Sequence, residues 1–248
     1  MANTPSVIRM LENGPNGLTP MTLNPADFQS ALPEQNVHVY YSNPDRGLTV
    51  GVWDTTTMQE AFGPYPGDEF VVVLDGEFSM LDGDGKGVPA KKDQLVAFRS
   101  GSPVSWKQDG YLKKFYLTLN DPKTPQPDLA SAAGGIIVMD PNYVLTDADA
   151  LPTPAGYPVE REREFFTNDD KTMIVGLWDS QASKGEMAPF PAHEIVFMIE
   201  GEVTIHEPNG ISQTFVAGDA FFIPKGTQCR WEIPTYIRKY FAAVDQEG

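Results

Sequence analysis

Short apolar runs separated by turn residues fill most of this chain. Examples are "LTVGVWD" (48–54), "EFVVVLDGEF" (69–78) and "EIVFMIEGEV" (194–203). Runs of about four to eight residues, rich in β-branched and aromatic side chains and bounded by Gly, Pro or Asp, are typical of β-strands. No long run carries apolar residues at helical spacing. The pattern therefore predicts an all-β protein built from many short strands.

The strand pattern occurs twice along the chain. "YYSNPDRGLTVGVWD" (40–54) aligns with "FFTNDDKTMIVGLWD" (165–179) at an offset of 125 residues, and six of the fifteen positions are identical. The similarity extends over about residues 40–121 and 165–246. Because each copy has enough short strands for one barrel, the repeat predicts two barrels in tandem.

Residues able to bind or react recur at matching places in the two copies. Glu69 of the first copy corresponds to Glu194 of the second, in a strand where alternation puts Glu194, Val196 and Met198 on one face. Each copy also has a lysine near its end. This lysine could neutralise the glutamate, bind a ligand carboxylate or face the solvent. The other matched residues are Trp53 with Trp178, Trp106 with Trp231, and Lys114 with Lys239.

The limits of the repeat predict the domain boundaries. We expect an N-terminal barrel over residues 1–122, a linker with an added strand over 123–164, and a C-terminal barrel over 165–248. The linker begins with a Pro- and Ala/Gly-rich stretch, which is typical of a connection between domains. Residues 136–145 have the pattern of a strand that adds to the edge of the second barrel, and residues 1–39 are candidates for the same role in the first.

Charge and composition exclude several classes of partner. The net charge is −16, from 34 acidic and 18 basic residues, so nucleic acid and anionic membrane surfaces are not expected as partners. No apolar stretch reaches the roughly 18 residues of a membrane span, and the N-terminus lacks the pattern of a signal peptide. The single cysteine excludes an internal disulfide and fits a reducing cytoplasm, which is the expected location.

The second copy resembles a known protein family. Glu194 is followed at fixed spacing by Gly201-Glu202, then by "GDAFFIPKG" (218–226), by Trp231 and by "RKYF" (238–241). This combination resembles the ethanolamine-utilisation-protein-like branch of the cupin superfamily. The resemblance implies a bicupin, which consists of two tandem barrels of the jelly-roll or double-stranded β-helix type.

The resemblance also bears on metal binding. Cupins that hold a metal use two histidines and a glutamate from their first motif and a third histidine from their second. Aligned with this family pattern, Glu194 stands at the position of the metal-binding glutamate and Cys229 at that of the third histidine. The positions of the first two histidines fall in "MAPF" (187–190). A transition metal normally needs three or four ligands. We therefore expect no metal cofactor; a bound divalent Mn, Fe, Ni or Zn ion would involve Glu194, Cys229 and His206.

Glu194 and Cys229 are the candidate catalytic residues. A carboxylate inside an apolar barrel can bind a cationic group or act as a base, and a thiolate can act as a nucleophile. The alternative is a glutamate bonded to a neighbouring side chain and an inert buried cysteine. His193, adjacent on the strand, points away from Glu194 towards the rim. The predicted ligand pocket consists of Glu69, Glu194, Met198, Cys229, Trp231, Lys239 and Trp178.

Two functions of different class are compatible with these residues. In the first, the C-terminal barrel binds a small metabolite without the three-histidine metal site, for sensing or for small-molecule catabolism. In the second, the chain is a metal-dependent enzyme similar to the ureidoglycine aminohydrolases or to other cupin hydrolases, isomerases or dioxygenases. Both imply a small-molecule ligand. Because exposed strand edges favour pairing, and bicupins commonly associate in this way, we also expect a homodimer.

Overall fold

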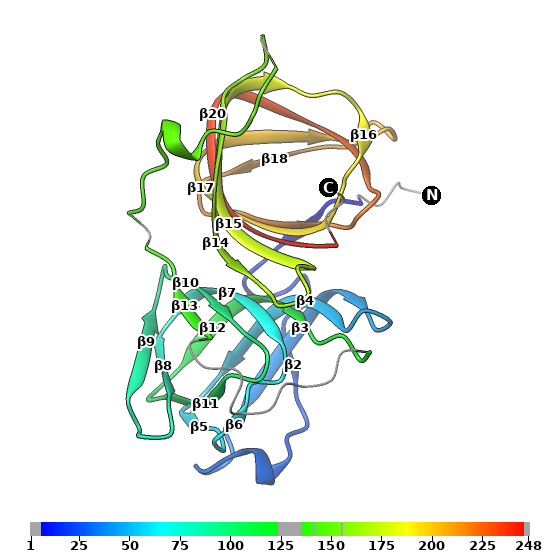
Figure 1. The fold of residues 1–248 in the computed structure, drawn as a ribbon. Coiled ribbons are helices and arrows are strands. Elements are labelled where there is room, and N and C mark those ends of the chain that lie inside the picture. The colour runs from blue at the N-terminus through cyan, green and yellow to red at the C-terminus, as the bar shows by residue number, and fades with distance from the viewer. Residues whose placement is uncertain (1–5, 124–134, 141, 155, 246–248) are drawn as a thin grey trace. The chain divides into compact units, whose positions relative to one another are not determined.

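The computed structural model describes residues 6–123, 135–140, 142–154 and 156–245. The chain divides into two compact units (Figure 1). We call Leu11–Pro141 the N-terminal barrel, and Met1–Met10 with Asn142–Gly248 the C-terminal barrel. In the described residues regular structure is almost entirely β, and the two helices are single 3-10 turns. Neither helix is long or apolar enough to cross a membrane.

Two antiparallel sheets form the N-terminal barrel. The larger has the order β13-β10-β7-β12-β4-β3-β2, and the smaller has the order β5-β11-β8-β9, with β6 pairing to β11. The elements are β2 (Thr19–Pro20), η1 (Pro25–Asp27), β3 (Gln35–Asn43), β4 (Leu48–Thr55), β5 (Met58–Gln59), β6 (Gly63–Pro64), β7 (Asp68–Asp75), β8 (Glu77–Leu81), β9 (Gly87–Lys91), β10 (Leu95–Phe98), β11 (Pro103–Gln108), β12 (Leu112–Leu119) and β13 (Ile136–Val138).

The C-terminal barrel repeats this plan with longer strands. Its main path is β1-β19-β17-β20-β15-β14, with β18 pairing to β17 and β16 to β20. β17 covers the sequence that corresponds to β7 and β8, and register shifts along it allow one strand to serve both sides of the barrel. The elements are β1 (Ile8–Met10), η2 (Asp147–Asp149), β14 (Glu160–Thr167), β15 (Met173–Lys184), β16 (Ala188–Pro189), β17 (His193–His206), β18 (Ser212–Val216), β19 (Ala220–Ile223) and β20 (Gln228–Val244).

Each barrel has its own apolar core, and strand alternation explains which residues enter it. Val71 and Val73 of β7 belong to one buried cluster with Trp106. In the C-terminal barrel Val196 and Met198 of β17 share a buried cluster with Cys229. Since side chains two apart on a strand share a face, the predicted inward direction of Glu194, Val196 and Met198 is confirmed for the two apolar members by this cluster.

A glycine is required at the corresponding turn in both copies. Gly76 and Gly201 have φ angles of 80° and 79°, in the left-handed region. A Cβ atom would lie 2.1 Å from the Tyr111 carbonyl oxygen at Gly76, and 1.9 Å from the Tyr236 carbonyl oxygen at Gly201. Only glycine fits such a backbone approach, which explains the Gly-Glu pair in both copies.

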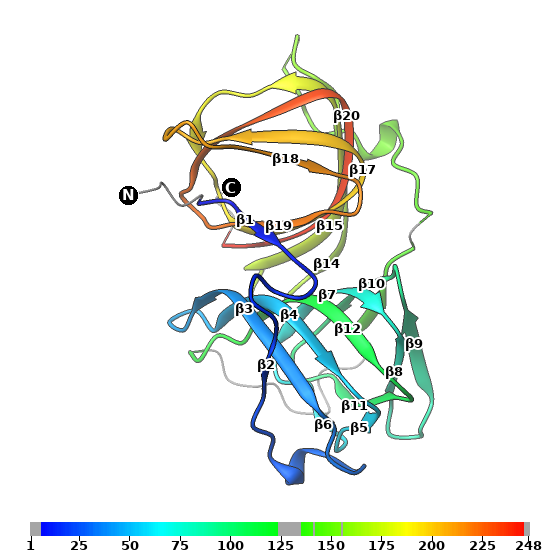
Figure 2. The same cartoon turned by 180° about the vertical axis from the view of Figure 1, so that it is seen from behind.

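The edge strands are distributed differently from the expectation. β1 lies antiparallel to β19, so the start of the chain completes the C-terminal barrel (Figure 2). β13 pairs with β10, so residues 136–138 extend the N-terminal barrel rather than the second one. The expected edge roles of 1–39 and 136–145 are therefore corrected, although β2 and β3 of the first segment do extend the N-terminal barrel. Residues 124–134 of the expected linker lie outside the described residues.

Three contacts hold β1 in place. Arg9 forms an ion pair with Asp219 at 2.8 Å, and its guanidinium group lies 4.2 Å from the centre of the Phe215 ring. The buried Glu207 carboxylate accepts the backbone N–H groups of Ser6 and Val7. The strand is therefore bound by charge, by a cation–π contact and by hydrogen bonds, in addition to its pairing with β19.

Candidate functional site

A lysine–glutamate ion pair lies inside the C-terminal barrel. Lys239 of β20 donates a hydrogen bond to Glu194 of β17, and both side chains are buried. The ring centres of Trp178 and Trp231 lie 5.1 and 4.9 Å from Lys239 Nζ. Because indole faces attract cations, the two rings and the carboxylate together hold the ammonium group in the barrel interior.

The N-terminal barrel contains the same arrangement. Lys114 Nζ of β12 lies 2.8 Å from Glu69 Oε1 of β7. The ring centres of Trp53 and Trp106 lie 5.0 and 4.5 Å from that nitrogen. Tyr65 donates its hydroxyl to the other oxygen of Glu69. Each residue of the pair, and each tryptophan, is the counterpart of one in the C-terminal barrel, so the repeat in sequence is also a repeat of a polar centre.

The contribution of these buried ion pairs to the stability of the fold does not by itself explain why both barrels contain one. Taking a carboxylate and an ammonium group out of water costs several kcal/mol per ion, which their attraction offsets only with good geometry. An apolar pair of similar volume would serve the core as well. The buried charges therefore direct attention to binding.

A cavity of about 240 Å³ opens beside the N-terminal ion pair. Pockets that bind drug-sized ligands usually measure about 300–1,000 Å³, so this one suits a smaller molecule. The walls combine aromatic rings with convergent polar groups, as small-molecule sites commonly do. The lining residues are Met21, Gln35, Val37, Trp53, Glu60, Tyr65, Glu69, Trp106, Lys114, Tyr116 and Thr118.

Glu60 is the second carboxylate of this cavity. Its backbone is fixed against β11, since its N–H donates to Trp106 O at 2.8 Å and its carbonyl accepts from Ser105 Oγ at 2.6 Å. Among the residues that the structure describes, its carboxylate has no hydrogen-bond partner. Burial raises the pKa of Glu60 to about 7; Lys114 lowers it, and the charges of Glu69 and Asp27 raise it. A carboxyl group near neutrality thus faces the cavity.

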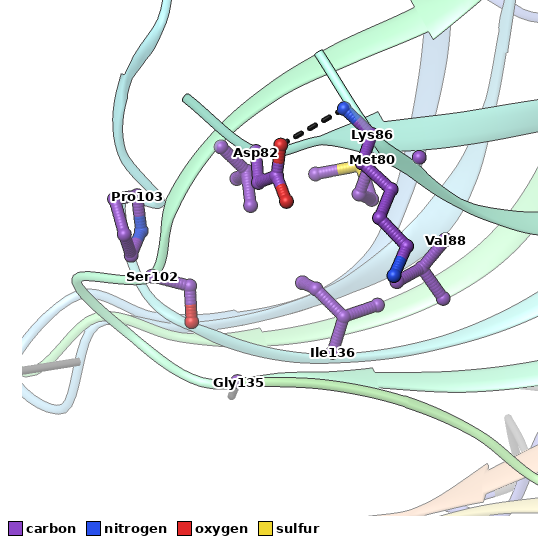
Figure 3. Close-up of a pocket in the computed structure, with 10 residues that line it drawn as sticks. Met80, Asp82, Lys86, Val88, Ser102, Pro103, Gly135 and Ile136 are labelled. Carbon is purple, nitrogen blue, oxygen red and sulfur yellow. Dashed lines mark hydrogen bonds between the residues drawn. The ribbon is translucent and has the colours of Figure 1, made fainter. Parts of the chain in front are cut away.

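A second cavity of the same barrel lies beside the turn between β8 and β9 (Figure 3). It measures about 390 Å³ and has mainly apolar walls, including Met80, Val104 and Ile136. Its charged residues are on the exposed β8–β9 turn, where the Asp82 carboxylate accepts the backbone N–H of Lys86 at 2.9 Å. The residues that line this cavity therefore supply no buried charged centre.

Comparison with known proteins identifies the second copy. Residues 167–241 match the family model described as the EutQ-like cupin domain. The C-terminal barrel is a EutQ-like cupin domain. No curated protein matches the chain. The match to this family model confirms the resemblance suggested by the residues and spacing of the second copy.

The whole chain has the bicupin fold. A protein of unknown function from the DUF861 family of Pseudomonas syringae pv. tomato is 21% identical, with a TM-score of 0.75 over 97% of this chain and 100% of that one. A cupin 2 conserved barrel domain protein from Leptotrichia buccalis is 9% identical, with a TM-score of 0.57 over 87% and 90%. Hazelnut (Corylus avellana) vicilin is 10% identical, with a TM-score of 0.50 over 99% and 87%. At these identities the likeness concerns the fold.

The residues of this bicupin do not fit the metal that many cupins hold. A transition metal needs three or four side-chain ligands. In each barrel the glutamate that the resemblance and the repeat align with a metal ligand pairs with a lysine, and in the N-terminal barrel Tyr65 donates to its second oxygen. The part of the chain that the structure describes contains no group of three or more His, Cys, Asp or Glu residues that could hold an ion. The fixed cation of each centre is an ammonium group.

Cys229 lies in the core of the EutQ-like cupin domain and is poorly suited to catalysis. It is buried in the cluster that contains Met198. Burial raises the pKa of its thiol to about 11, with the Glu207 charge adding to the rise, the Trp231 indole opposing it, and Glu194 contributing least. A thiol with that pKa carries almost no thiolate at neutral pH, and thiolate is the nucleophilic form. The candidate pair Glu194 and Cys229 is instead a glutamate bonded to lysine and a protonated thiol.

Two histidines considered as candidates lie away from this centre. His206, at the far end of β17, places Nδ1 2.8 Å from Ser212 Oγ and Nε2 3.2 Å from a carboxylate oxygen of Glu232. His193 points to the face opposite Glu194, as alternation predicted, but it is buried rather than at the rim. Its Nδ1 accepts the backbone N–H of Lys225 at 3.1 Å, which explains how a buried imidazole is accommodated.

Glu60 and the two cavity tyrosines were missed as functional candidates. The sequence signal that could have identified them is a difference between the two copies, whereas the repeat is recognised from residues that match. At the offset of 125 residues, Glu60, Tyr65 and Tyr116 correspond to Gly185, Phe190 and Phe241. The N-terminal barrel therefore carries a carboxyl and two hydroxyl groups that the C-terminal barrel lacks at those positions.

Proposed function

We propose that this bicupin binds a small polar metabolite in the cavity of its N-terminal barrel, without a transition metal, for sensing or for small-molecule catabolism. The observation that carries the proposal is the cavity of about 240 Å³ on whose wall the Glu69–Lys114 pair and Glu60 converge. Polar groups that are held in place by a rigid barrel can orient a ligand at little entropic cost.

The fixed geometry of the polar groups supports binding rather than group transfer. Glu69 is held by Lys114 and Tyr65, and Lys114 lies between tryptophan rings. An ammonium group has three N–H donors, and Glu69 takes one of them. The remaining donors, with the Tyr116 hydroxyl, are available to oxygen atoms of a ligand.

The test is a thermal-shift screen of metabolites on the full chain, followed by calorimetric titration of each hit. The variant Thr118→Phe fills the cavity from β12, where Thr118 lines it and is half-buried. We expect hits to bind the natural protein and to lose at least tenfold in affinity in Thr118→Phe, with the fold unchanged by circular dichroism. Hits that bind both proteins equally would move the site elsewhere.

The C-terminal barrel is the second candidate for the ligand site. Trp178 and Trp231 are half-buried there, whereas Trp53 and Trp106 are buried, so the Lys239 centre has the more exposed aromatic wall. A ligand in that barrel would be unaffected by Thr118→Phe and would lose affinity in Trp231→Phe. The two variants therefore distinguish the two barrels.

A further inference from the structure

Accepting the proposed binding site, we infer the chemical class of its ligand: the N-terminal cavity takes a small organic ammonium ion whose charged group pairs with Glu60. The inference rests on three features of the cavity, which are its charge count, the hydrogen-bonding state of its two carboxylates and the nature of its walls.

The charge count leaves one carboxylate without a counter-charge. Glu60 and Glu69 face the cavity, and Lys114 supplies the one ammonium group among the lining residues. Lys114 contacts Glu69 at 2.8 Å. With Glu60 ionised, the site carries a net negative charge, which a monovalent cation neutralises.

The hydrogen bonds identify Glu60 as the free acceptor. Both oxygens of Glu69 are used, one by Lys114 and the other by Tyr65. The Glu60 carboxylate has no such partner in the described chain, while its backbone is fixed by Trp106 and Ser105. A half-buried carboxylate is costly without a donor, and an ammonium group supplies both donors and charge.

The walls suit the remainder of such a ligand. Trp53 and Trp106 offer apolar ring surface, and Val37 and Met21 add aliphatic surface. An anionic ligand would instead meet two carboxylates, and Glu69 already balances the charge of the one lysine. A metal ion would find a single free carboxylate. The cavity of about 240 Å³ suits a ligand smaller than a drug-sized molecule.

Binding of an ammonium ion is linked to ionisation of Glu60. The groups that face this carboxyl are Lys114, Glu69, Asp27 and Tyr65. With a pKa of about 7, Glu60 is half ionised at neutral pH, and a cation binds the ionised form. Affinity should therefore rise up to about tenfold per pH unit below pH 7 and level off above it.

The experiment compares three probes of similar size on the full chain: propylamine as its ammonium salt, propan-1-ol and propionate. Each is titrated by calorimetry and ligand-observed NMR from about pH 6 to about pH 8, on either side of the Glu60 pKa. The variants are Glu60→Gln, which keeps the shape and removes the charge, and Glu162→Gln. Glu162 is the matched control because it is a half-buried carboxyl of the C-terminal barrel, near Lys239.

We expect propylammonium to bind at least tenfold more tightly than propan-1-ol above pH 7, and its affinity to rise with pH. Glu60→Gln should remove both the preference and the pH dependence, and Glu162→Gln should keep them. Preference for propionate or propan-1-ol, affinity that falls as pH rises, or no binding by any probe overturns the inference. A non-cationic metabolite whose binding is blocked by Thr118→Phe would overturn the ligand class and leave the proposed function intact.

Discussion

Lys114 and Glu69 form an ion pair that the C-terminal barrel reproduces in Lys239 and Glu194. In both barrels the lysine stands 45 residues after its glutamate and lies between two tryptophan rings. The glutamate that the cupin resemblance aligns with a metal ligand is thus paired with an ammonium group of the chain itself.

Breaking the C-terminal ion pair should cost more than replacing it. Glu194→Leu or Lys239→Met alone leaves an unpaired buried charge, and each should lower the free energy of unfolding by about 3–5 kcal/mol. The double variant removes both charges and should recover most of that loss. Urea denaturation of the four proteins measures the coupling. If the losses of the two single variants simply add in the double variant, the two charges do not depend on each other.

Titration of Glu60 should make the free energy of unfolding depend on pH. Its pKa is raised from 4.5 to about 7 in the folded state, so between these values the folded protein holds a proton that the unfolded chain has lost. Stability should fall as pH rises through that window and be constant above it, each pKa unit being worth about 1.4 kcal/mol before screening by solvent. Glu60→Gln should flatten this part of the curve, as followed by urea denaturation at each pH. An unchanged slope in the variant would assign the titration to another group.

Cys229 should react slowly with thiol reagents. Its thiol has a pKa of about 11 and is buried, so at pH 8 less than about one part in a hundred is thiolate. Modification by a disulfide reagent should be slow in the folded protein and rapid in urea. Cys229→Ala should keep the fold and lose about 1 kcal/mol through the smaller side chain. Fast labelling of the folded protein would restore Cys229 as a reactive residue.

Removal of residues 1–10 should weaken the C-terminal barrel selectively. The deletion uncovers β19, leaves Phe215 without Arg9 and leaves the buried Glu207 without its backbone donors. Breaking such contacts costs several kcal/mol together. Unfolding of each barrel can be followed separately by tryptophan fluorescence. One variant keeps only Trp53 and Trp106, and the other keeps only Trp178 and Trp231. Equal loss in both barrels would contradict the pairing of β1 with β19.

Divalent metals should not stabilise the natural protein. With a lysine on each glutamate, a metal ion would have to displace an ammonium group and then find further ligands. Added Mn, Ni or Zn should leave the melting temperature unchanged, and Glu194→Gln should alter nothing in that response. A rise in melting temperature that Glu194→Gln abolishes would show that a metal site does form. Metal analysis of protein purified without a chelating column provides the independent check.

The repeat in the sequence predicted the two barrels and matched the glutamates, lysines and tryptophans of the two centres, but it left open whether each lysine pairs with its glutamate or faces solvent. Since strand side chains alternate, matching Glu69 with Glu194 also placed both glutamates on the inward face. Glu60 could not be found in this way. It lies in the short connection between β5 and β6, where no periodicity fixes a direction, and its counterpart is Gly185. Its role depends on the neighbours that folding brings to it, chiefly Lys114 and Glu69.

The barrel to which each edge strand, β1 and β13, belongs could not be predicted from the sequence either. β1 and β13 are three residues each, too short for a pattern that names a partner. Their apolar residues indicate a strand but suit either barrel. β1 pairs with the edge offered by β19, and β13 pairs with the edge offered by β10. These edges exist only in the folded barrels, so the sequence of a three-residue strand does not identify them.

The position of β1 has a consequence for the order in which the protein can mature on the ribosome. Residues 8–10 are synthesised long before residues 220–223, which form the strand that pairs with them. Closing a loop of this length is slow compared with local hairpin formation. The strands of the N-terminal barrel can therefore all pair during translation, whereas the C-terminal barrel can complete its pairing only after residues 220–223 have been made.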